Sequence, residues 1–474
     1  MDPELAAAAE AVLDANWLGS STLPGPRLYP HQWSWDSAFV AIGNAVRAPE
    51  RARLELDTLF GAQWSNGLVP HIVFRPQTDA YFPGPETWRT DVSPHAPRDR
   101  RTSGIVQPPV HASAVWRVHE LAPDPEASLA WLGRMLPRLA AWHDYLYRER
   151  DPEDDGLVSI RHPWESGMDD SPAWDAPLAA IELEPGSVPP YPRKDLTMAR
   201  AEERPTAAAY DQYVHLVELF KRCRYDEREI RARSRFVVED PAFNGLLAAA
   251  GQDLARIAEA VGEDASRFRE QAERTARQLD TRLWNDALQA YVPFDRVARR
   301  QVLAAVAGGF VPLFAGIPSA GRAQLMARRL DSERFWAAGG GGTPGAAGGG
   351  ANPASAGGRG FPVPTCDRVS PAFVPTRYWR GPCWVNVNWL IESGLRRYDF
   401  SGYADAIRAA TLGLVRRGGF REYFHPETGE GLGSDQFSWS AALALELLRE
   451  PSPAGTNPRI SSARRSGWSS GTNE

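Results

Sequence analysis

Glu126–Arg148 reads EASLAWLGRMLPRLAAWHDYLYR, and it is the stretch that decides the fold class. Its large apolar residues are spaced three and four positions apart, which is the period of one face of an α-helix. They are Leu129, Leu132, Met135, Leu136, Leu139, Trp142 and Tyr145. We interpret this stripe as the buried face of a long helix, since a stripe of this width normally packs into a core.

The same periodicity recurs along the chain, whereas the alternating pattern of strands is scarce. Short strand-like pieces such as residues 290–294 are interpreted as hairpin decorations. About a dozen helices are predicted, at residues 5–17, 37–46, 50–64, 110–121, 126–148, 206–223, 241–262, 264–284, 300–314, 320–330, 384–398, 401–417 and 435–450. An all-α protein of this kind fits six helical hairpins closed in a ring, with long loops building one concave face.

Composition narrows the function classes. The 474 residues carry a formal net charge of −6, which argues against a nucleic-acid partner. The three cysteines, Cys223, Cys366 and Cys383, are too few and too widely spaced for a disulfide framework or a zinc site. The uncharged run 302–320 is broken by glycines and prolines, so we interpret it as a buried helix and turn, not a membrane span. The N-terminus has no signal-peptide pattern and the cysteines are interpreted as reduced thiols, so we expect a cytoplasmic protein. We also expect no cofactor and no metal.

Residues 1–450 are expected to form a single domain. The Gly-rich stretch 337–360 is interpreted as a flexible insertion within it, because it is almost free of large side chains. The segment 451–474 is rich in Ser, Gly, Pro and Arg and is interpreted as a disordered tail.

Acidic residues framed by aromatic side chains mark two loops that lie far apart in the sequence. Trp164–Pro172, WESGMDDSP, holds three carboxylates and a glycine turn, and FREYFHP at 420–426 holds Glu422. Asp169 or Asp170 would suit a general acid, although adjacent acids also cap helices or bind cations. Glu422 would suit a general base, although pairing with Arg421 is the structural alternative.

Three further clusters combine aromatic and polar side chains. Asp36 in YPHQWSWDS, from Tyr29, would suit two sugar hydroxyls, although it could instead cap a helix. A second cluster surrounds His71 and Tyr81, with Gln107 downstream, and YWRGPCW from Tyr378 suits a planar or anionic group. Repeated pairing of Trp with acids favours carbohydrate binding, because a pyranose has an apolar face and a rim of hydroxyls.

These motifs resemble glycoside hydrolase family 63 and, within it, the bacterial mannosylglycerate and glucosylglycerate hydrolases. The matching stretches are YPHQWSWDSAFVAIG from Tyr29, QWSNGLVPHIVF from Gln63, WESGMD from Trp164, YWRGP from Tyr378 and EYFHPETG from Glu422. The resemblance implies an (α/α)6 barrel and an inverting mechanism, with Asp169 as general acid and Glu422 as general base. It makes residues 1–450 a glycosidase catalytic domain.

The resemblance also implies a set of substrate-binding residues. Around the sugar these are Trp33, Trp35, Asp36, Trp164, Glu165 and Trp384, where Glu165 would hold a hydroxyl or tune the acid. Around a glycerate group they are Tyr29, His71, Tyr81, Gln107, Arg204, Tyr378 and Trp379, with Arg380 and Gly381 in the same loop. Arg204 is chosen because a glycerate carboxylate needs a cation.

We therefore expect an inverting α-glycosidase that releases glucose or mannose from an α-hexosylglycerate. A trehalase-like or oligosaccharide-trimming α-glucosidase of the same clan is the enzymatic alternative. A sugar-binding helical toroid without catalysis is the alternative from another class, and the presence of both Asp169 and Glu422 speaks against it.

Overall fold

The computed structural model describes residues 2–76, 81–197, 199–336 and 361–449, so the predicted insertion 337–360 and tail 451–474 lie outside the described residues. Helices dominate this part of the chain. They are α1 (Pro3–Ala15), α2 (Ser34–Arg47), α3 (Pro49–Phe60), α4 (Pro85–Trp88), α5 (His111–Glu120), α6 (Pro125–Arg150), α7 (Asp175–Ala179), α8 (Ala207–Arg222), α9 (Glu227–Arg233), α10 (Pro241–Ala260), α11 (Ser266–Arg282), α12 (Ala320–Leu330), α13 (Val385–Arg397), α14 (Ser401–Gly418) and α15 (Ser438–Leu448).

Short 3₁₀ helices and strands fill the loops. The 3₁₀ helices are η1 (Thr90–Val92), η2 (Pro163–Ser166), η3 (Pro172–Trp174), η4 (Lys194–Thr197), η5 (Ala201–Glu203) and η6 (Ala307–Leu313). The strands are β1 (Gln32–Trp33), β2 (Ile72–Phe74), β3 (Arg101–Thr102), β4 (Val238–Glu239), β5 (Trp284–Asn285), β6 (Ala290–Tyr291), β7 (Phe294–Asp295), β8 (Arg300–Gln301), β9 (Tyr423–Phe424) and β10 (Gly431–Leu432). All pairs are antiparallel, in sheets ordered β1-β2-β3, β4-β7-β8, β5-β6 and β9-β10.

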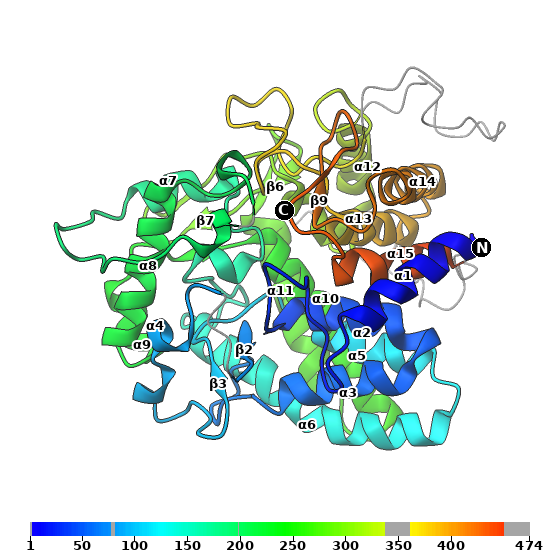
Figure 1. The fold of residues 1–474 in the computed structure, drawn as a ribbon, viewed down its shortest axis with the longest axis horizontal. Coiled ribbons are helices and arrows are strands. Elements are labelled where there is room, and N and C mark those ends of the chain that lie inside the picture. Colours follow the sequence, from blue (N-terminus) through cyan, green and yellow to red (C-terminus); the bar gives the residue numbers. More distant parts are fainter. Residues whose placement is uncertain (1, 77–80, 198, 337–360, 450–474) are drawn as a thin grey trace, which may run out of the picture.

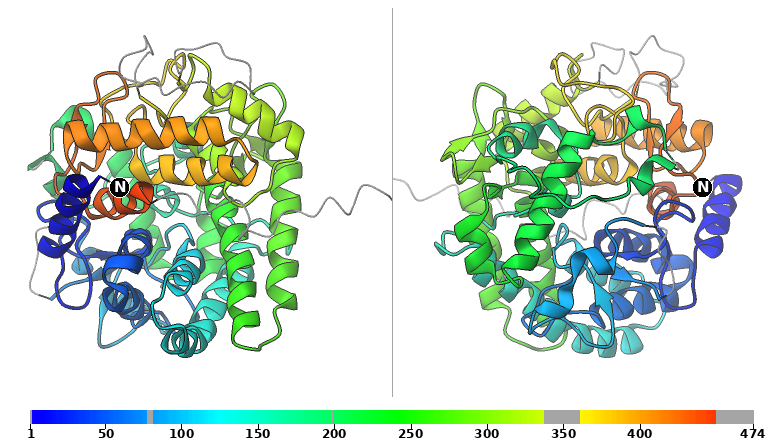
Figure 2. Two further views of the ribbon diagram at one scale, coloured as in Figure 1. Left: turned by 90° about the vertical axis from the view of Figure 1, so that its right-hand side faces the viewer. Right: turned by 60° about the vertical axis from the view of Figure 1, so that its left-hand side comes forward.

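Six inner elements close into a ring. Around it, α15 packs on α2, α2 on α5, α5 on α10, α10 on η6, η6 on α13, and α13 back on α15. Outer helices alternate with them along the chain and pack on their neighbours, as in the pairs α2 with α3, α10 with α11 and α13 with α14. These pairs follow one another around the molecule in the left view of Figure 2. The predicted ring of helical hairpins, an (α/α)6 barrel, is therefore confirmed.

Helix α6 shows why the periodic stripe predicts a core helix. The Asp124 carboxylate caps its first turn by accepting from the Ala127 N–H at 3.0 Å. Trp131, Met135 and Leu139 are fully buried as a stripe with a period of four. The predicted stripe is wrong at its start, because Leu129 is 40% exposed and Trp131 takes the inner position.

The inner element predicted as a helix over 300–314 is different in the structure. Residues 300–301 form β8, and only residues 307–313 are helical, as the seven-residue 3₁₀ helix η6. Gly309 approaches the chain so closely that a Cβ there would lie 2.3 Å from the Tyr291 carbonyl oxygen. Pro312 removes a further N–H donor. A regular α-helix is therefore replaced by a tighter turn at this place in the ring.

The core is continuous around the ring. One cluster of buried apolar residues runs from Leu5 to Leu448 and includes side chains of every inner helix. None of the described helices is both long and apolar enough to cross a membrane.

The loops before several inner helices meet at one end of the ring. The segment between α6 and α10 makes a long excursion there, and its helices α8 and α9 lie with α4, β2 and β3 on one side of the molecule (Figure 1). Tyr29–Trp33 precede α2, Gln107 precedes α5, Tyr378–Trp384 precede α13, and Glu422 precedes α15. The loops before these four helices therefore lie at the same end of the ring and surround a common space.

Candidate active site

A cavity opens at this end of the ring. Its walls come from the loops before the inner helices α2, α5, α13 and α15, from the first turns of α2 and α15, and from the excursion between α6 and α10. The lining residues are Leu28, Tyr29, Trp33, Trp35, Asp36, His71, Tyr81, Phe82, Gln107, Trp164, Gly167, Asp169, Lys194, Asp195, Arg204, Pro205, Tyr210, Tyr378, Trp379, Trp384, Glu422, Phe437 and Trp439. The fold thus brings Asp169 and Glu422 to one cavity, although they are far apart in the sequence.

Asp169 lies on a loop whose shape depends on a glycine. Gly167 has φ +70°, and a Cβ there would lie 2.5 Å from the Trp35 ring, so only glycine fits this turn. The backbone carbonyl of Asp169 accepts a hydrogen bond from Tyr213 Oη at 2.5 Å. Burial raises the pKa of Asp169 to about 7, and the positive charge of Arg204 opposes that rise. At neutral pH this carboxyl is therefore available as a proton donor.

Glu422 lies just before β9, far along the chain from Asp169, and it is almost completely buried. Its Oε1 accepts from Tyr29 Oη at 2.5 Å, and its Oε2 accepts from the Ser434 N–H at 2.9 Å. Burial raises the pKa of Glu422, while Arg204, whose Nη1 lies 3.8 Å from Oε1, lowers it. The side chain therefore has the donors it needs to stay charged and is more basic than an exposed glutamate.

Arg204 is held by several groups at once. Its Nη1 donates to Tyr29 Oη at 3.2 Å, and its Nε lies 3.5 Å from Asp195 Oδ2. Its guanidinium carbon stands 4.2 Å from the centroid of the Tyr378 ring. A buried arginine that contacts two carboxylates and an aromatic ring is a rigid cation on the cavity wall.

Asp36 lies in the first turn of α2. The helix begins at Ser34 with Trp33 as its N-cap residue, so the alternative of Asp36 as the cap is wrong. Burial raises the pKa of Asp36 well above its usual range, and the nearby charges of Glu422 and Glu55 add to that rise. A carboxyl in this setting can exchange hydrogen bonds with sugar hydroxyls.

The aromatic walls differ in the surface they offer. Trp384 stacks on Trp379 with ring centroids 3.8 Å apart and on Tyr423 at 4.6 Å. Both of its faces are therefore covered, and Trp384 can present only an edge to a ligand. Trp33 meets Tyr29 and Tyr81 edge-on instead, with centroids 5.3 and 5.0 Å apart.

His71 and Gln107 line the cavity as predicted, and each is tied to the protein. The Nδ1 of His71 lies 3.1 Å from Ser103 Oγ, and burial holds the pKa of His71 well below its usual value. It is therefore a neutral imidazole at physiological pH. The amide oxygen of Gln107 accepts from the Trp35 N–H at 3.1 Å.

Glu165 is predicted to hold a sugar hydroxyl or to tune the acid; it does not line the cavity, which leaves the second role as the prediction. It is 0% exposed, and both of its oxygens accept from Arg150 at 2.8 Å. Although burial acts to raise its pKa, Arg150 and two backbone N–H groups hold it below the usual range. Both carboxylate oxygens therefore accept hydrogen bonds from protein donors and do not contact a ligand.

Arg380 and Gly381 also lie outside the cavity lining. The Arg380 guanidinium pairs with Asp175, and its Nε lies 3.4 Å from Asp170. A Cβ at Gly381 would lie 2.5 Å from the Val374 carbonyl oxygen, so this glycine serves a tight backbone crossing. Both residues therefore shape the loop that carries Tyr378 rather than face a ligand. Asp170, the other candidate acid of this motif, does not line the cavity and pairs with Arg377 at 2.8 Å.

The sequence predicts Trp164, Asp169 and Arg204 from the excursion, but it does not predict three further residues of that segment. Lys194, Asp195 and Tyr210 line the cavity, yet none lies in an aromatic-acid motif. One signal was present: Lys194 is one of only two lysines in an arginine-rich chain. Within the described residues, no group of three or more His, Cys, Asp or Glu is placed to hold a metal ion.

Comparisons with known proteins agree with this arrangement. The family model described as the mannosylglycerate hydrolase MGH1-like glycoside hydrolase domain matches residues 29–440. A mannosylglycerate hydrolase of Rubrobacter radiotolerans is 47% identical over 94% of this chain and 97% of its own length. A glucosylglycerate hydrolase of Mycolicibacterium hassiacum is 39% identical over 94% of this chain and 98% of its own length.

A solved structure extends the likeness to three dimensions. The family 63 mannosylglycerate hydrolase of Thermus thermophilus, crystallised with Tris and D-glycerate, superposes with a TM-score of 0.84. The two chains are 42% identical, and the match covers 94% of this chain and 100% of the other. The chain therefore belongs to glycoside hydrolase family 63, in the mannosylglycerate hydrolase MGH1-like group.

Proposed function

We propose that this protein hydrolyses an α-hexosylglycerate, glucosyl or mannosyl, with inversion at the anomeric carbon. The observation that carries the proposal is the pair of carboxyl groups in one cavity, one with a pKa near 7 and one held ready to act as a base. Full-length relatives named for both sugars support the substrate class.

Asp169 is the proposed general acid. With a pKa raised to about 7, a large share of its carboxyl groups carry a proton at neutral pH. That proton passes to the glycosidic oxygen as the bond to the anomeric carbon breaks, so this oxygen leaves as a neutral hydroxyl group of glycerate.

Glu422 is the proposed general base. It takes a proton from a water molecule that attacks the anomeric carbon from the face opposite the leaving group. Its hydrogen bonds with Tyr29 and Ser434 fix the direction of its carboxylate. An inverting pair needs room for this water, and its carboxyl groups normally stand about 6.5–9.5 Å apart.

The cation at the cavity wall supports glycerate as the leaving group. Arg204 supplies a buried positive charge there, and Lys194 lines the same cavity. A glycerate carboxylate brought to these residues would form charge-assisted hydrogen bonds. We propose that the sugar occupies the side of Asp36, Trp33 and Trp35, and the glycerate the side of Arg204.

We also propose that the protein is cytoplasmic. Its three cysteines are free and buried, as in proteins that keep reduced thiols.

A hydrolysis panel tests the proposed function directly. The panel contains glucosylglycerate, mannosylglycerate, trehalose and kojibiose, and NMR follows the anomer that is first released. We expect rapid release of the β-anomer from one or both glycerates and much slower release from the disaccharides. First release of the α-anomer would contradict inversion, and preference for a disaccharide would favour the α-glucosidase alternative.

A further inference from the structure

Glu165 occupies an unusual position directly behind the loop that carries Asp169. It lies in η2, and only Ser166, Gly167 and Met168 separate it from Asp169. It is completely buried, yet it does not line the cavity. From this position Glu165 cannot contact a ligand, but its carboxylate can hold the loop that carries Asp169.

Four donors converge on its carboxylate. Arg150 donates through Nη1 to Oε2 and through Nη2 to Oε1, both at 2.8 Å. The Arg161 backbone N–H donates to Oε2 at 2.6 Å, and the Val106 N–H reaches Oε1 at 3.3 Å. Each oxygen therefore accepts one hydrogen bond from a side chain and one from the backbone, and together these bonds fix the position and orientation of the carboxylate.

These donors belong to three different segments. Arg150 ends α6, Arg161 begins the loop that leads to Asp169, and Val106 precedes Gln107. Gln107 in turn accepts from the backbone of Trp35, whose ring packs against Gly167. The Glu165 carboxylate thus links the loop of the proposed acid to the aromatic wall of the cavity.

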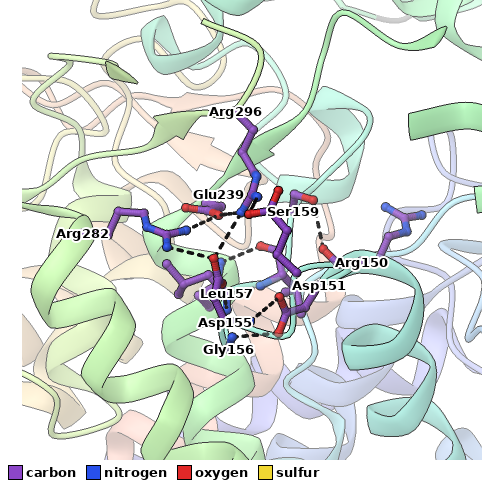
Figure 3. A network of polar contacts seen from close by, with 12 residues as sticks. Arg150, Asp151, Asp155, Gly156, Leu157, Ser159, Glu239, Arg282 and Arg296 are labelled. Atoms are coloured by element: carbon purple, nitrogen blue, oxygen red, sulfur yellow. Dashed lines mark hydrogen bonds and ion pairs between the residues drawn. The ribbon is translucent and has the colours of Figure 1, made fainter. Parts of the chain in front are cut away.

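Arg150 is itself well anchored. Its backbone carbonyl accepts from both the N–H and the Oγ of Ser159 at 3.0 Å, as Figure 3 shows. Its Nη2 also pairs with Glu227 at 2.8 Å. The end of α6 is therefore a fixed point against which the loop is held.

We propose that Glu165 is a positioning residue for the general acid, whose carboxylate fixes the 161–169 loop so that the Asp169 carboxyl meets the glycosidic oxygen. This inference rests on the proposed function and assigns to Glu165 a role that acts through Asp169. A proton donor must lie within hydrogen-bond reach of the atom it protonates, so a small displacement of the loop costs rate rather than binding.

The chain offers a matched control for a buried glutamate that stabilises the fold only. Glu239 in β4 is also 0% exposed and accepts from Arg282 at 2.8 Å and from Arg296. Figure 3 shows it between these two arginines, which come from α11 and from the turn after β7. Glu239→Gln disturbs a buried ion pair as Glu165→Gln does, but at a group that makes no bond to the acid loop.

The experiment compares two substrates for wild type, Glu165→Gln and Glu239→Gln. One is the hexosylglycerate that wild type hydrolyses, and the other is the α-fluoride of the same hexose. Fluoride leaves with little help from a proton donor, whereas the glycerate oxygen needs one. We expect Glu165→Gln to lower kcat on the glycerate by about 100-fold or more, and on the fluoride by less than about fivefold, since general acid catalysis contributes about 10²- to 10⁴-fold.

Glu239→Gln is expected to lower kcat equally little on both substrates, even if both variants lose thermal stability. Glu165→Asp is a milder second variant, because the shorter carboxylate keeps its charge but cannot span Arg150 and both backbone donors. We expect it to show the same selective loss at about 10-fold. Equal losses on both substrates in Glu165→Asp and Glu165→Gln, or no loss on the glycerate, would overturn the inference. If the wild-type protein hydrolyses neither substrate, the proposed function itself is rejected.

Discussion

Arg204 connects the two proposed catalytic carboxyls at the scale of single residues. Its charge lowers the pKa of both Asp169 and Glu422 against the effect of burial. Without it, two acids in one buried cavity would both tend to hold protons, and neither would serve as a base. The site therefore depends on one arginine to oppose the protonation of both carboxyls, and the arginine contacts Glu422 Oε1 at 3.8 Å, where it favours the charged form that a base needs.

Removal of either proposed catalytic carboxyl should nearly abolish turnover. For Asp169→Asn and Glu422→Gln we expect kcat to fall by about 10²- to 10⁴-fold, because each removes a proton-transfer group while keeping its shape. Calorimetry should still detect substrate binding. Asp175→Asn changes a carboxylate whose side chain is 51% exposed and serves as the control. Near-normal kcat in Asp169→Asn or Glu422→Gln would contradict the assignment.

The raised pKa of Asp169 predicts a pH dependence with a definite sign. As a general acid it must be protonated, so kcat/KM should decline as pH rises through about 7. The folded protein also holds this proton more tightly than the unfolded chain, so stability falls as pH rises from the ordinary pKa of 3.8 to about 7 and stays at its lower level above that pH. Asp169→Asn should therefore raise Tm more at pH 8 than at pH 5. A rise of equal size at both pH values would show that this carboxyl has an ordinary pKa.

Arg204→Ala separates glycerate recognition from tuning of the base. Because Arg204 contacts Glu422, kcat should fall for every substrate. If Arg204 also holds the glycerate carboxylate, KM should rise by at least about 10-fold for hexosylglycerate and little for neutral α-glucosides, since a charge-assisted hydrogen bond contributes about 1.5–3 kcal/mol. Steady-state kinetics on both classes measure the difference. An equal rise in KM for both classes would refute the role in glycerate binding.

At the scale of elements, η6 is the least regular part of the ring. It provides only a short 3₁₀ helix where the other positions have α-helices. Close approach of its backbone to β6 takes the place of side-chain packing at Gly309. The ring accommodates this element because its neighbours α10 and α13 both pack against it.

Two glycine substitutions should have opposite effects on stability. In Gly309→Ala the new methyl group would lie 2.3 Å from the Tyr291 carbonyl oxygen, so we expect marked destabilisation. In Gly413→Ala the methyl group meets open space within α14, so we expect stabilisation by up to about 1 kcal/mol from helix propensity. Urea unfolding of both variants measures the two changes. A stable Gly309→Ala protein would show that η6 can shift away from β6.

At the scale of the whole molecule, the outer helix α1 packs on the last inner helix, α15. Asn16 Nδ2, just after α1, donates to Ser438 Oγ at 2.9 Å and to the Gln436 carbonyl at 2.7 Å. Ser438 Oγ donates onward to the Leu23 carbonyl at 2.5 Å. These bonds join chain segments more than 400 residues apart, so this contact contributes to the stability of the complete fold.

Asn16→Ala should therefore lower global stability rather than loosen one end. We expect the free energy of unfolding to fall by about 1–3 kcal/mol, because the buried Ser438 Oγ and the Gln436 carbonyl both lose their donor. Hydrogen exchange should show the loss in α2 and α13 as well as in α1. Faster exchange confined to α1 would indicate that α1 opens independently of the ring.

Several features of this protein are determined by the sequence alone. Helix positions such as that of α6 follow from local periodicity, because an apolar stripe with a period of 3.6 is a property of neighbouring residues. The meeting of Asp169 and Glu422 could also be predicted, because their motifs resemble those of a known family. Gly167 could be assigned to a tight turn from its place between two acids and aromatics.

Other features are decided only by the tertiary structure. Glu165 and Trp384 are both predicted from the sequence to contact a ligand. The structure shows that Arg150 occupies the Glu165 carboxylate, whereas Trp384 lines the cavity with only its edge free, because Trp379 and Tyr423 cover its faces. Lys194 enters the cavity from a segment without any motif. The physical reason is that hydrogen-bond partners, ring faces and solvent access depend on contacts between distant segments, which local patterns do not encode.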